Sequence, residues 1–142
     1  MKVIFDTNVI IDVLERREPF FLDSYAVLQL SATKKVDGFI CAGCITDIHY
    51  ILRKNITDKN KVEDAITGLA KLVGVCDTLA SDITLSHTFK MNDFEDAVIA
   101  ATAKRENANY IVTRNKQDFK NSPVPAIYPT ELLSLVTHED DK

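Results

Sequence analysis

Apolar residues recur along this chain in two alternating patterns. Short continuous apolar runs are typical of buried strands, and they lie at 3–5, 39–41, 74–76, 110–113 and 126–127. Between these runs, apolar residues return every three or four positions, which is the spacing of a helix with one buried face. Strands that alternate with helices predict an α/β fold, a three-layer α/β/α sandwich with a parallel sheet of four to five strands.

The segments with helical spacing follow these strands in order. They lie at about 9–14, 21–35, 44–55, 58–73, 78–88, 93–105 and from about 130 onward. In the second of them we expect Tyr25, Leu28 and either Ala32 or Leu30 on the buried face, because these residues fall on one side of a helix.

Side chains that can cap helices stand where two of these helices would begin. Thr57 or Asp58 precedes the fourth helix, and Thr78 or Ser81 can begin the fifth. A hydroxyl or carboxylate in such a position accepts a hydrogen bond from a free backbone N–H of the first helical turn. We therefore expect both helices to start at one of these residues.

Length and composition indicate one ordinary globular domain. The chain has 142 residues, of which 46% are hydrophobic and 27% are charged. A chain of this length buries roughly two-thirds of the surface that it exposes when unfolded. We therefore expect a single domain over residues 1–137, followed by a disordered acidic tail at 138–142.

Several features predict a cytoplasmic protein without a membrane span. Asp6, Asn8 and Asp12 interrupt the apolar N-terminus before the core of a signal peptide could form. No run approaches the roughly 20 apolar residues that a transmembrane helix needs. Three cysteines in a chain without an export signal fit a reducing compartment. The net charge of −4 argues against a bulk electrostatic grip on nucleic acid, although it permits a local basic rim.

Acidic residues occupy the ends of the predicted strands and the starts of the helices. Asp6 follows the first strand, Asp118 follows the fourth by a short connection, and Asp47 and Asp96 lie in the first turns of two helices. Ligands of parallel sheets bind at the carboxyl ends of the strands. Carboxylates gathered there repel one another unless a cation neutralises them, and Mg²⁺ or Mn²⁺ prefers such oxygen ligands. The pattern favours a metal site for the hydrolysis of phosphodiesters.

Each of these acids also has a purely structural interpretation. Asp6 can be the N-cap of the helix that follows it, and Asp47 can favour the dipole of its own helix. Asp93 can cap the helix in which Asp96 occupies the third position. Asp118 can simply end a turn. Each of these structural roles is plausible for a single acid. It is less probable that all four acids stand at strand and helix ends for such reasons alone.

The residues also resemble a known family. The chain is similar to the PIN-domain ribonucleases, and among them to the VapC-type toxins of bacterial toxin–antitoxin pairs. The resemblance extends over nearly the whole chain and rests on Asp6-Thr7-Asn8-Val9, the helical segment from Asp47 to Arg53, Asp96-Ala97 with its alanine-rich helix, and Thr113-Arg114-Asn115 with Asp118-Phe119.

The resemblance implies a catalytic and metal-binding quartet with Mg²⁺ or Mn²⁺ as the cofactor. Its members would be Asp6, Asp47, Asp96 and Asp118, with Asp93 as a further ligand and Asn8 and Thr113 in supporting positions. The chain departs from the family in two respects. Asp47 is one methylene shorter than the glutamate usual there, and Asn115 stands where many members carry the last acid. We expect Asp118 to be the fourth ligand and Asn115 a neutral co-ligand.

The same resemblance implies substrate and partners. The expected reaction is endonucleolytic cleavage of single-stranded regions of RNA, often in tRNA or rRNA, by metal-activated water. Arg114 and Lys116 lie beside Asp118 in the sequence and would contact the RNA. The family further implies a cognate antitoxin protein and a homodimer.

Two other functions compete with this one. Cys41-Ala42-Gly43-Cys44 places a C-x-x-C pair between a strand and a helix, where a thiol redox protein would carry its reactive cysteine. A PIN-like fold could also persist as a binding module whose metal site has decayed. The sequence lacks a glycine-rich phosphate loop and the ligand spacing of a zinc site.

Overall fold

In the part of the chain that the structure describes, five parallel strands form one sheet. The structure, a computed structural model, describes residues 1–140 and the side chains of residues 1–139. The sheet has the order β3-β2-β1-β4-β5. Its strands are β1 (Lys2–Phe5), β2 (Asp37–Cys41), β3 (Gly74–Cys76), β4 (Tyr110–Val112) and β5 (Ala126–Ile127). The predicted α/β fold with a parallel sheet is confirmed.

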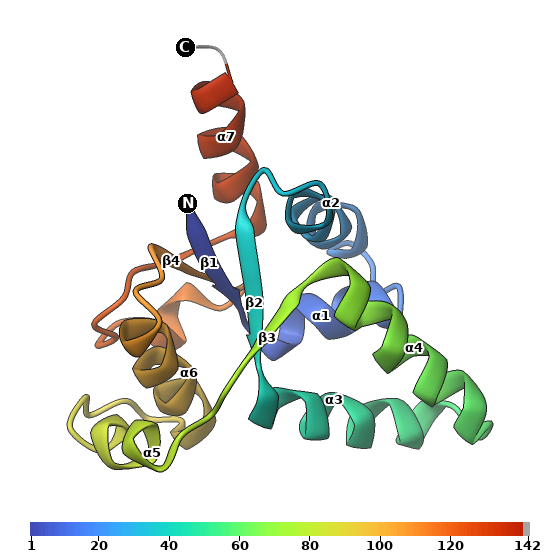
Figure 1. Cartoon of the computed structure of the whole chain (residues 1–142), viewed down its shortest axis with the longest axis horizontal. Coiled ribbons are helices and arrows are strands. Elements are labelled where there is room, and N and C mark those ends of the chain that lie inside the picture. The colour runs from blue at the N-terminus through green and yellow to red at the C-terminus, as the bar shows by residue number, and fades with distance from the viewer. Residues whose placement is uncertain (141–142) are drawn as a thin grey trace.

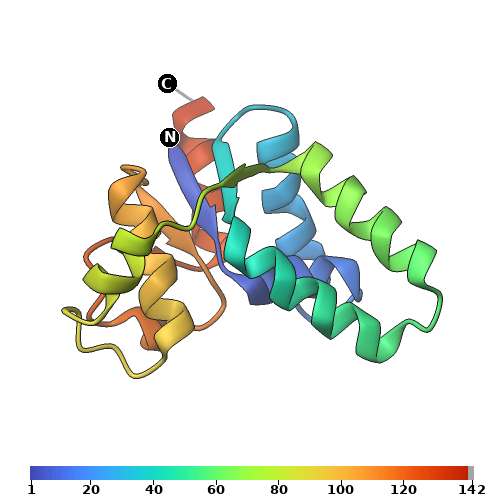
Figure 2. The ribbon, with the colours of Figure 1, turned by 60° about the horizontal axis from the view of Figure 1, so that its bottom comes forward.

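Helices cover both faces of this sheet. They are α1 (Thr7–Leu14), α2 (Phe21–Ala32), α3 (Ala42–Asn55), α4 (Lys59–Leu72), α5 (Ala80–Ser86), α6 (Phe94–Arg105) and α7 (Pro129–Asp140), with a short 3₁₀ helix, η1 (Lys116–Phe119). Figure 1 shows α5 and α6 on one side of the strands and α1 to α4 on the other. The turned view in Figure 2 shows the same separation, with α3 and α4 side by side.

The core lies between these layers and is densest around β1. Val3, Ile4 and Phe5 are fully buried, as expected for a central strand with helices on both faces. The chain approaches β1 closely at Gly38 of β2, where an added Cβ would lie 2.7 Å from the Phe5 ring. Any other residue at this position would therefore push the two strands or α2 apart.

Helix α2 differs from its prediction. It ends at Ala32, and its buried residues are Ser24, Val27 and Leu28. Tyr25 is 42% exposed, so its expected burial is wrong. The tyrosine ring instead stacks on Phe21 with centroids 5.7 Å apart, on the solvent side of the helix. Leu28 is buried as predicted.

The starts of two helices test the expected caps. Asp58 is the N-cap of α4 and accepts a hydrogen bond from the N–H of Asn60, as predicted. Helix α5 starts elsewhere than expected: its N-cap is Leu79, whose N–H donates to Asp82. Thr78 serves the neighbouring helix instead, because its hydroxyl accepts the N–H of Gly43 in the first turn of α3.

The C-terminal helix is longer than expected. Helix α7 continues through Asp140, so residues 138–140 of the predicted tail lie within this helix. Residues 141–142 of that predicted tail lie outside the described residues. Within the part of the chain that the structure describes, every helix is too short or too polar to cross a membrane.

Candidate active site

The topology of the sheet brings the ends of β1 and β4 together. β1 and β4 are neighbours in the sheet, although β2 and β3 come between them in sequence. The strand order therefore reverses at β1, with β2 and β3 on one side of it and β4 and β5 on the other. Such a switch point is where parallel sheets bind ligands. Phe5 pairs with Val112 in the register, and the N–H of Asp6 donates to the carbonyl of Val112 over 2.9 Å. Asp6 therefore leaves the sheet beside the end of β4.

Asp6 is held in place by hydrogen bonds from both sides. Its carboxylate accepts the N–H of Thr7 over 2.8 Å, which makes it the N-cap of α1. The hydroxyl of Thr113 donates to the other carboxylate oxygen over 2.8 Å. Thr113 is itself fully buried and accepts from the side chain of Asn8 and the N–H of Asn115. The two predicted supporting residues thus fix the orientation of Asp6.

Helix α6 presents two more of the predicted acids at its start. Asp93 is the N-cap, and its carboxylate accepts the N–H of Asp96 over 2.9 Å, so the expected capping role is confirmed. Across from them, η1 carries Asp118, and its N–H donates to the carbonyl of Asn115. One turn of 3₁₀ helix therefore places Asp118 near the end of β4.

These acids line a common cleft of about 260 Å³. Its wall consists of side chains from β1–α1, α3, α6 and the segment after β4: Asp6, Thr7, Asn8, Ile11, Arg17, Ile51, Asp93, Glu95, Asp96, Asn115 and Asp118. Asp6, Asp93, Asp96 and Asp118, together with Asn8 and Asn115, were predicted as site residues and are brought together here.

The acids of the cleft perturb one another. Burial raises the pKa of Asp96 to about 8, and the negative charges of Asp6, Asp93 and Asp118 contribute to the shift. Burial also raises the pKa of Asp6, although its hydrogen bonds from Thr113 and Thr7 oppose the change. Within the described side chains, no ion pair includes any of these four acids. A cation would relieve this repulsion.

The donor set fits a hard divalent cation. Carboxylate and amide oxygens are the ligands that Mg²⁺ and Mn²⁺ prefer. The buried Oδ1 of Asn8, at this cleft, has no hydrogen-bond partner, which leaves one more oxygen free to coordinate. In the present arrangement of residues 1–139, no three Asp, Glu, His or Cys side chains stand close enough to hold an ion together. Coordination by several of the acids therefore requires their side chains to turn inward.

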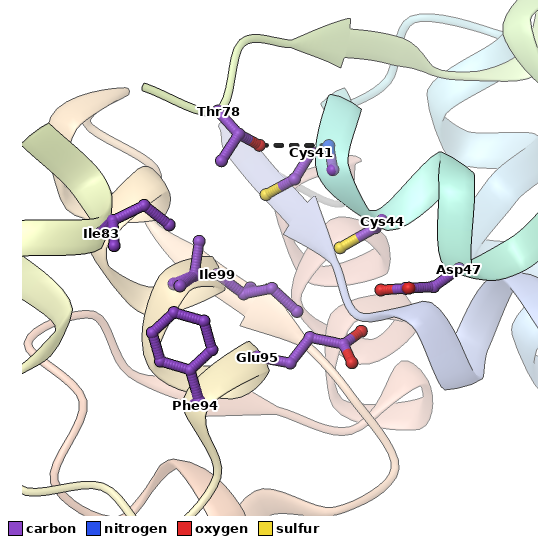
Figure 3. A pocket seen from close by; sticks show the side chains of 10 residues that line it. Cys41, Cys44, Asp47, Thr78, Ile83, Phe94, Glu95 and Ile99 are labelled. Carbon is purple, nitrogen blue, oxygen red and sulfur yellow. Dashed lines mark hydrogen bonds between the residues drawn. The ribbon is translucent and has the colours of Figure 1, made fainter. Parts of the chain in front are cut away.

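Asp47 lies outside the lining of the acidic cleft. It borders a second pocket with Cys41, Cys44 and Glu95, and Figure 3 shows its carboxylate facing that of Glu95. Burial raises the pKa of Glu95 to about 7, and the charge of Asp47 and a hydrogen bond between the two carboxyl groups add to the shift. Unlike Asp47, Glu95 lines both hollows.

Glu95 was not among the predicted site residues. The signal was present, because Glu95 directly precedes Asp96 at the start of the alanine-rich helix. Its importance depends on how close the starts of α3 and α6 lie to each other, which the sequence pattern does not define. The hydroxyl of Thr7 donates to Glu95 over 3.4 Å and connects it to the start of α1.

The predicted RNA-binding cations, Arg114 and Lys116, are not part of the cleft lining. Arg114 donates to the buried Asp12 over 2.8 Å and lies over the ring of Phe20. Lys116 pairs with Glu131 over 2.9 Å. Arg17, which was not predicted, is the cation in the cleft lining.

The cysteines are buried free thiols. Cys41, Cys44 and Cys76 lie in the core, and hydrogen bonds with the other two thiols raise the pKa of Cys41. A thiol redox enzyme needs an accessible thiolate with a lowered pKa at this position. The structure therefore offers no support for the redox alternative.

The fold and the cleft define a class of protein, a parallel α/β domain with a carboxylate cluster at the switch point of its sheet. A family model described as "PIN domain" matches residues 2–117. The chain therefore belongs to the PIN-domain family, as its sequence motifs predicted. A search of curated proteins finds no significant match.

Solved structures of similar fold include components of toxin–antitoxin systems. VapBC2 from Rickettsia felis, bound to a DNA fragment from its promoter, matches with a TM-score of 0.70 and 19% identity over 90% of this chain and 98% of that one. A toxin–antitoxin complex from Klebsiella pneumoniae matches with a TM-score of 0.66 and 20% identity over 89% and 97%. VapC20 from Mycobacterium tuberculosis, a toxin that cleaves the sarcin–ricin loop, matches with a TM-score of 0.61 and 14% identity over 77% and 86%.

Proposed function

We propose that this protein is a metal-dependent endoribonuclease that cleaves single-stranded regions of RNA, and that it is the toxin of a toxin–antitoxin pair. The observation that carries the proposal is the convergence of Asp6, Asp93, Asp96 and Asp118 on one cleft, where none of the four forms an ion pair with another described side chain. A fold gains no stability from such a cluster. Its retention at the switch point is explained by a ligand that needs several carboxylates.

Four acids and two amides would hold the cation. Asp6 and Asp96 are the firmest ligands, with Asp93, Asp118 and the oxygens of Asn8 and Asn115 beside them. Mg²⁺ or Mn²⁺ bound there would supply a nucleophilic water and offset charge on the phosphate. Thr113 keeps the carboxylate of Asp6 turned toward the cleft.

Asp47 would act from the edge of the site. Its carboxylate faces Glu95, which does reach the cleft, so Asp47 orients Glu95 or reaches the cation through water. This arrangement gives a role to the shorter side chain at this position. Glu95 would then place a carboxylate in the cleft, which a longer glutamate side chain at position 47 could have done itself.

RNA would enter past the few cations near the cleft. Arg17 lies in its lining and would contact a phosphate directly. Arg114 and Lys116 stay proposed contacts for RNA beyond the cleft, since their side chains remain 26% and 37% exposed. Each of the three cations pairs with an acid: Arg17 with Glu15, Arg114 with Asp12 and Lys116 with Glu131. Arg17 is expected to contribute most, because of the three it is the one that lines the cleft.

The proposed partners follow from the related structures. Two of the similar structures are complexes of a toxin with its antitoxin or of VapBC with promoter DNA, and a third is a toxin that cleaves the sarcin–ricin loop. We extend to this chain a cognate antitoxin, a homodimer, a cytoplasmic location and a substrate such as tRNA or rRNA.

Cleavage of RNA tests the proposal. Purified protein and its Asp96→Asn variant are incubated with a labelled single-stranded RNA and Mn²⁺, with and without EDTA. We expect the variant and the EDTA sample to lose about a hundredfold or more of the rate, since both remove the charge stabilisation of the transition state.

Asp58→Asn is the matched control. It removes one carboxylate by the same substitution, but at the exposed cap of α4, where asparagine caps equally well. Its rate should equal that of the parent protein. Equal rates in the parent and Asp96→Asn would contradict the proposal, and binding of neither Mn²⁺ nor RNA would indicate a decayed scaffold.

A further inference from the structure

A second pocket lies beside the acidic cleft. It has a volume of about 280 Å³ and is enclosed by the start of α3, α5 and α6. Figure 3 shows the side chains of Ile83, Phe94 and Ile99 along one side and the carboxylates of Asp47 and Glu95 at the other. The pocket therefore has apolar walls and one strongly polar end.

The two hollows share a wall. Glu95 lines both of them, and its neighbour Asp96 belongs to the proposed metal site. A strand of RNA with its phosphate at the acids could therefore place an adjacent base in the second pocket without leaving the surface. Single-stranded RNA is generally recognised in this way, through bases that are splayed out and stacked on aromatic side chains.

An aromatic residue stands at the mouth of the pocket. The side chain of Phe94 is 55% exposed, although a large apolar side chain is usually buried. Its ring is stacked against His87, with centroids 5.8 Å apart and an angle of 29° between the planes. One aromatic face supported from behind by a second ring is a suitable platform for a base.

We propose that this second pocket binds one base of the RNA substrate, next to the scissile phosphate, and that it selects bases with an exocyclic amino group. The proposal rests on the ribonuclease function proposed above and deepens it. Phe94 stacks on the base, and the carboxylates of Asp47 and Glu95 accept hydrogen bonds from its amino group. Cytosine, adenine and guanine carry such an amino group. Uracil has none, and its ring N–H lies between two carbonyl oxygens, which the carboxylates would repel.

The charge of the protein favours recognition through bases. With a net charge of −4, the chain has no overall positive charge for sequence-independent attraction to phosphates. The cleft itself holds one arginine, Arg17, against several acids. Contacts to a base would therefore add to the affinity of the protein for RNA, beyond the contribution of the phosphates.

The polar end of the pocket distinguishes a base from a second copy of the chain. An apolar protein surface placed over Phe94 would bury the carboxylates of Asp47 and Glu95 without hydrogen-bond donors, which is unfavourable. An amino-bearing base covers the apolar wall and also supplies the donors. The pocket is thus complementary to a base at both ends.

Base preference and its dependence on Phe94 test the inference. Single-stranded RNAs that differ only in cytosine or uracil next to the cleaved bond are compared by kcat/KM for the parent protein, Phe94→Ala, Phe94→Tyr and Tyr50→Ala. The parent should prefer cytosine about tenfold, Phe94→Ala should lose about tenfold on the cytosine RNA, and Phe94→Tyr should retain the parent's rate. Tyr50→Ala removes another exposed ring, 63% exposed on α3, and should change neither quantity.

Binding separates failure of this inference from failure of the ribonuclease function. Fluorescence anisotropy with Asp96→Asn and short oligo(C) or oligo(U) needs no cleavage. Tighter binding of oligo(C), lost when Phe94→Ala is added, supports the base pocket even if the parent cleaves no RNA. An equal preference for oligo(C) over oligo(U) in the Asp96→Asn protein with and without Phe94→Ala overturns the inference. Absence of binding to either oligonucleotide also overturns it. So does a Phe94→Ala effect that is confined to dimerisation, as measured by sedimentation.

Discussion

At the scale of single residues, Thr113 determines the position of Asp6. Its hydroxyl donates to Asp6 and accepts from Asn8 and from the backbone of Asn115, while the side chain is fully buried. A hydroxyl has one donor and two acceptor positions, so this residue uses its full capacity. Valine has the same shape as threonine, but its side chain can neither donate nor accept a hydrogen bond.

We therefore predict that Thr113→Val lowers the free energy of unfolding by about 1 to 3 kcal/mol, because buried polar groups lose their partner. Thr113→Ser keeps the hydroxyl and should lose less. Urea unfolding of the two variants in EDTA measures the difference. Equal stability of the two variants would mean that the hydroxyl does not hold Asp6.

The acids of the cleft give metal-free protein a characteristic response to pH. The pKa of Asp96 is about 8 in the folded protein, against about 3.9 for an unfolded chain. Between these values the folded state binds more protons than the unfolded state, so stability increases as the pH falls from about 8 toward 5. One such group contributes a slope of up to about 1.4 kcal/mol per pH unit.

Urea unfolding in EDTA at several pH values between 5 and 8 measures this slope. Asp96→Asn should reduce it, since the asparagine does not titrate, whereas Asp58→Asn should leave it unchanged. A parent protein that becomes less stable from pH 8 to pH 5, or an Asp96→Asn variant with the parent's slope, would contradict the assignment.

At the scale of elements, the position of α6 depends on its connection to α5. Asp82 of α5 is 2% exposed and accepts hydrogen bonds from Arg105 and Thr102 of α6. Burial alone would raise the pKa of Asp82, but Arg105 and the N–H of Leu79 hold it below its usual value. Since α6 begins with Asp93, Glu95 and Asp96, this ion pair helps to align the site.

We predict that Asp82→Asn destabilises the protein by about 3 kcal/mol, because Arg105 loses its buried partner. Glu63→Gln breaks an exposed contact with His49 and should cost less than about 1 kcal/mol. Thermal or urea unfolding at pH 7 compares them. The effect of Asp82→Asn should shrink as the pH falls below about 3.9, the ordinary pKa of an aspartate in an unfolded chain, and should be lost once the pH passes the lowered pKa of Asp82 in the folded protein. Similar small effects for both variants would refute the role given to this ion pair.

The positions of the strands and helices along the chain were predicted better than the way in which these elements pack together. The apolar runs predicted the strands, because a central parallel strand such as β1 is buried on both faces and leaves little ambiguity. Tyr25 was misplaced because an aromatic residue on α2 could be assigned to either side of a helix with weak amphipathic contrast. Thr78 was assigned to the nearest helix, although its partner, Gly43, lies 35 positions earlier.

At the scale of the whole molecule, the acids could be predicted to converge because sheet topology determines where strand ends meet. Asp6 and Asp118 follow neighbouring strands, β1 and β4. Asp93 and Asp96 lie at the start of α6, which precedes β4, and the sequence pattern alone does not define where that start lies relative to the sheet. The place of Asp47 could not be predicted in the same way. It depends on how close the start of α3 lies to the start of α6, and the result is that Asp47 faces Glu95 in the adjacent pocket.

The central claim is that the cleft lined by Asp6, Asp93, Asp96 and Asp118 binds the divalent cation. Titration calorimetry with Mn²⁺ tests it most directly, with the parent protein, Asp96→Asn, Asp47→Asn and the control Asp58→Asn. We predict that Asp96→Asn weakens binding at least about tenfold, that Asp47→Asn weakens it less, and that Asp58→Asn matches the parent. Undiminished Mn²⁺ affinity in Asp96→Asn would contradict the claim.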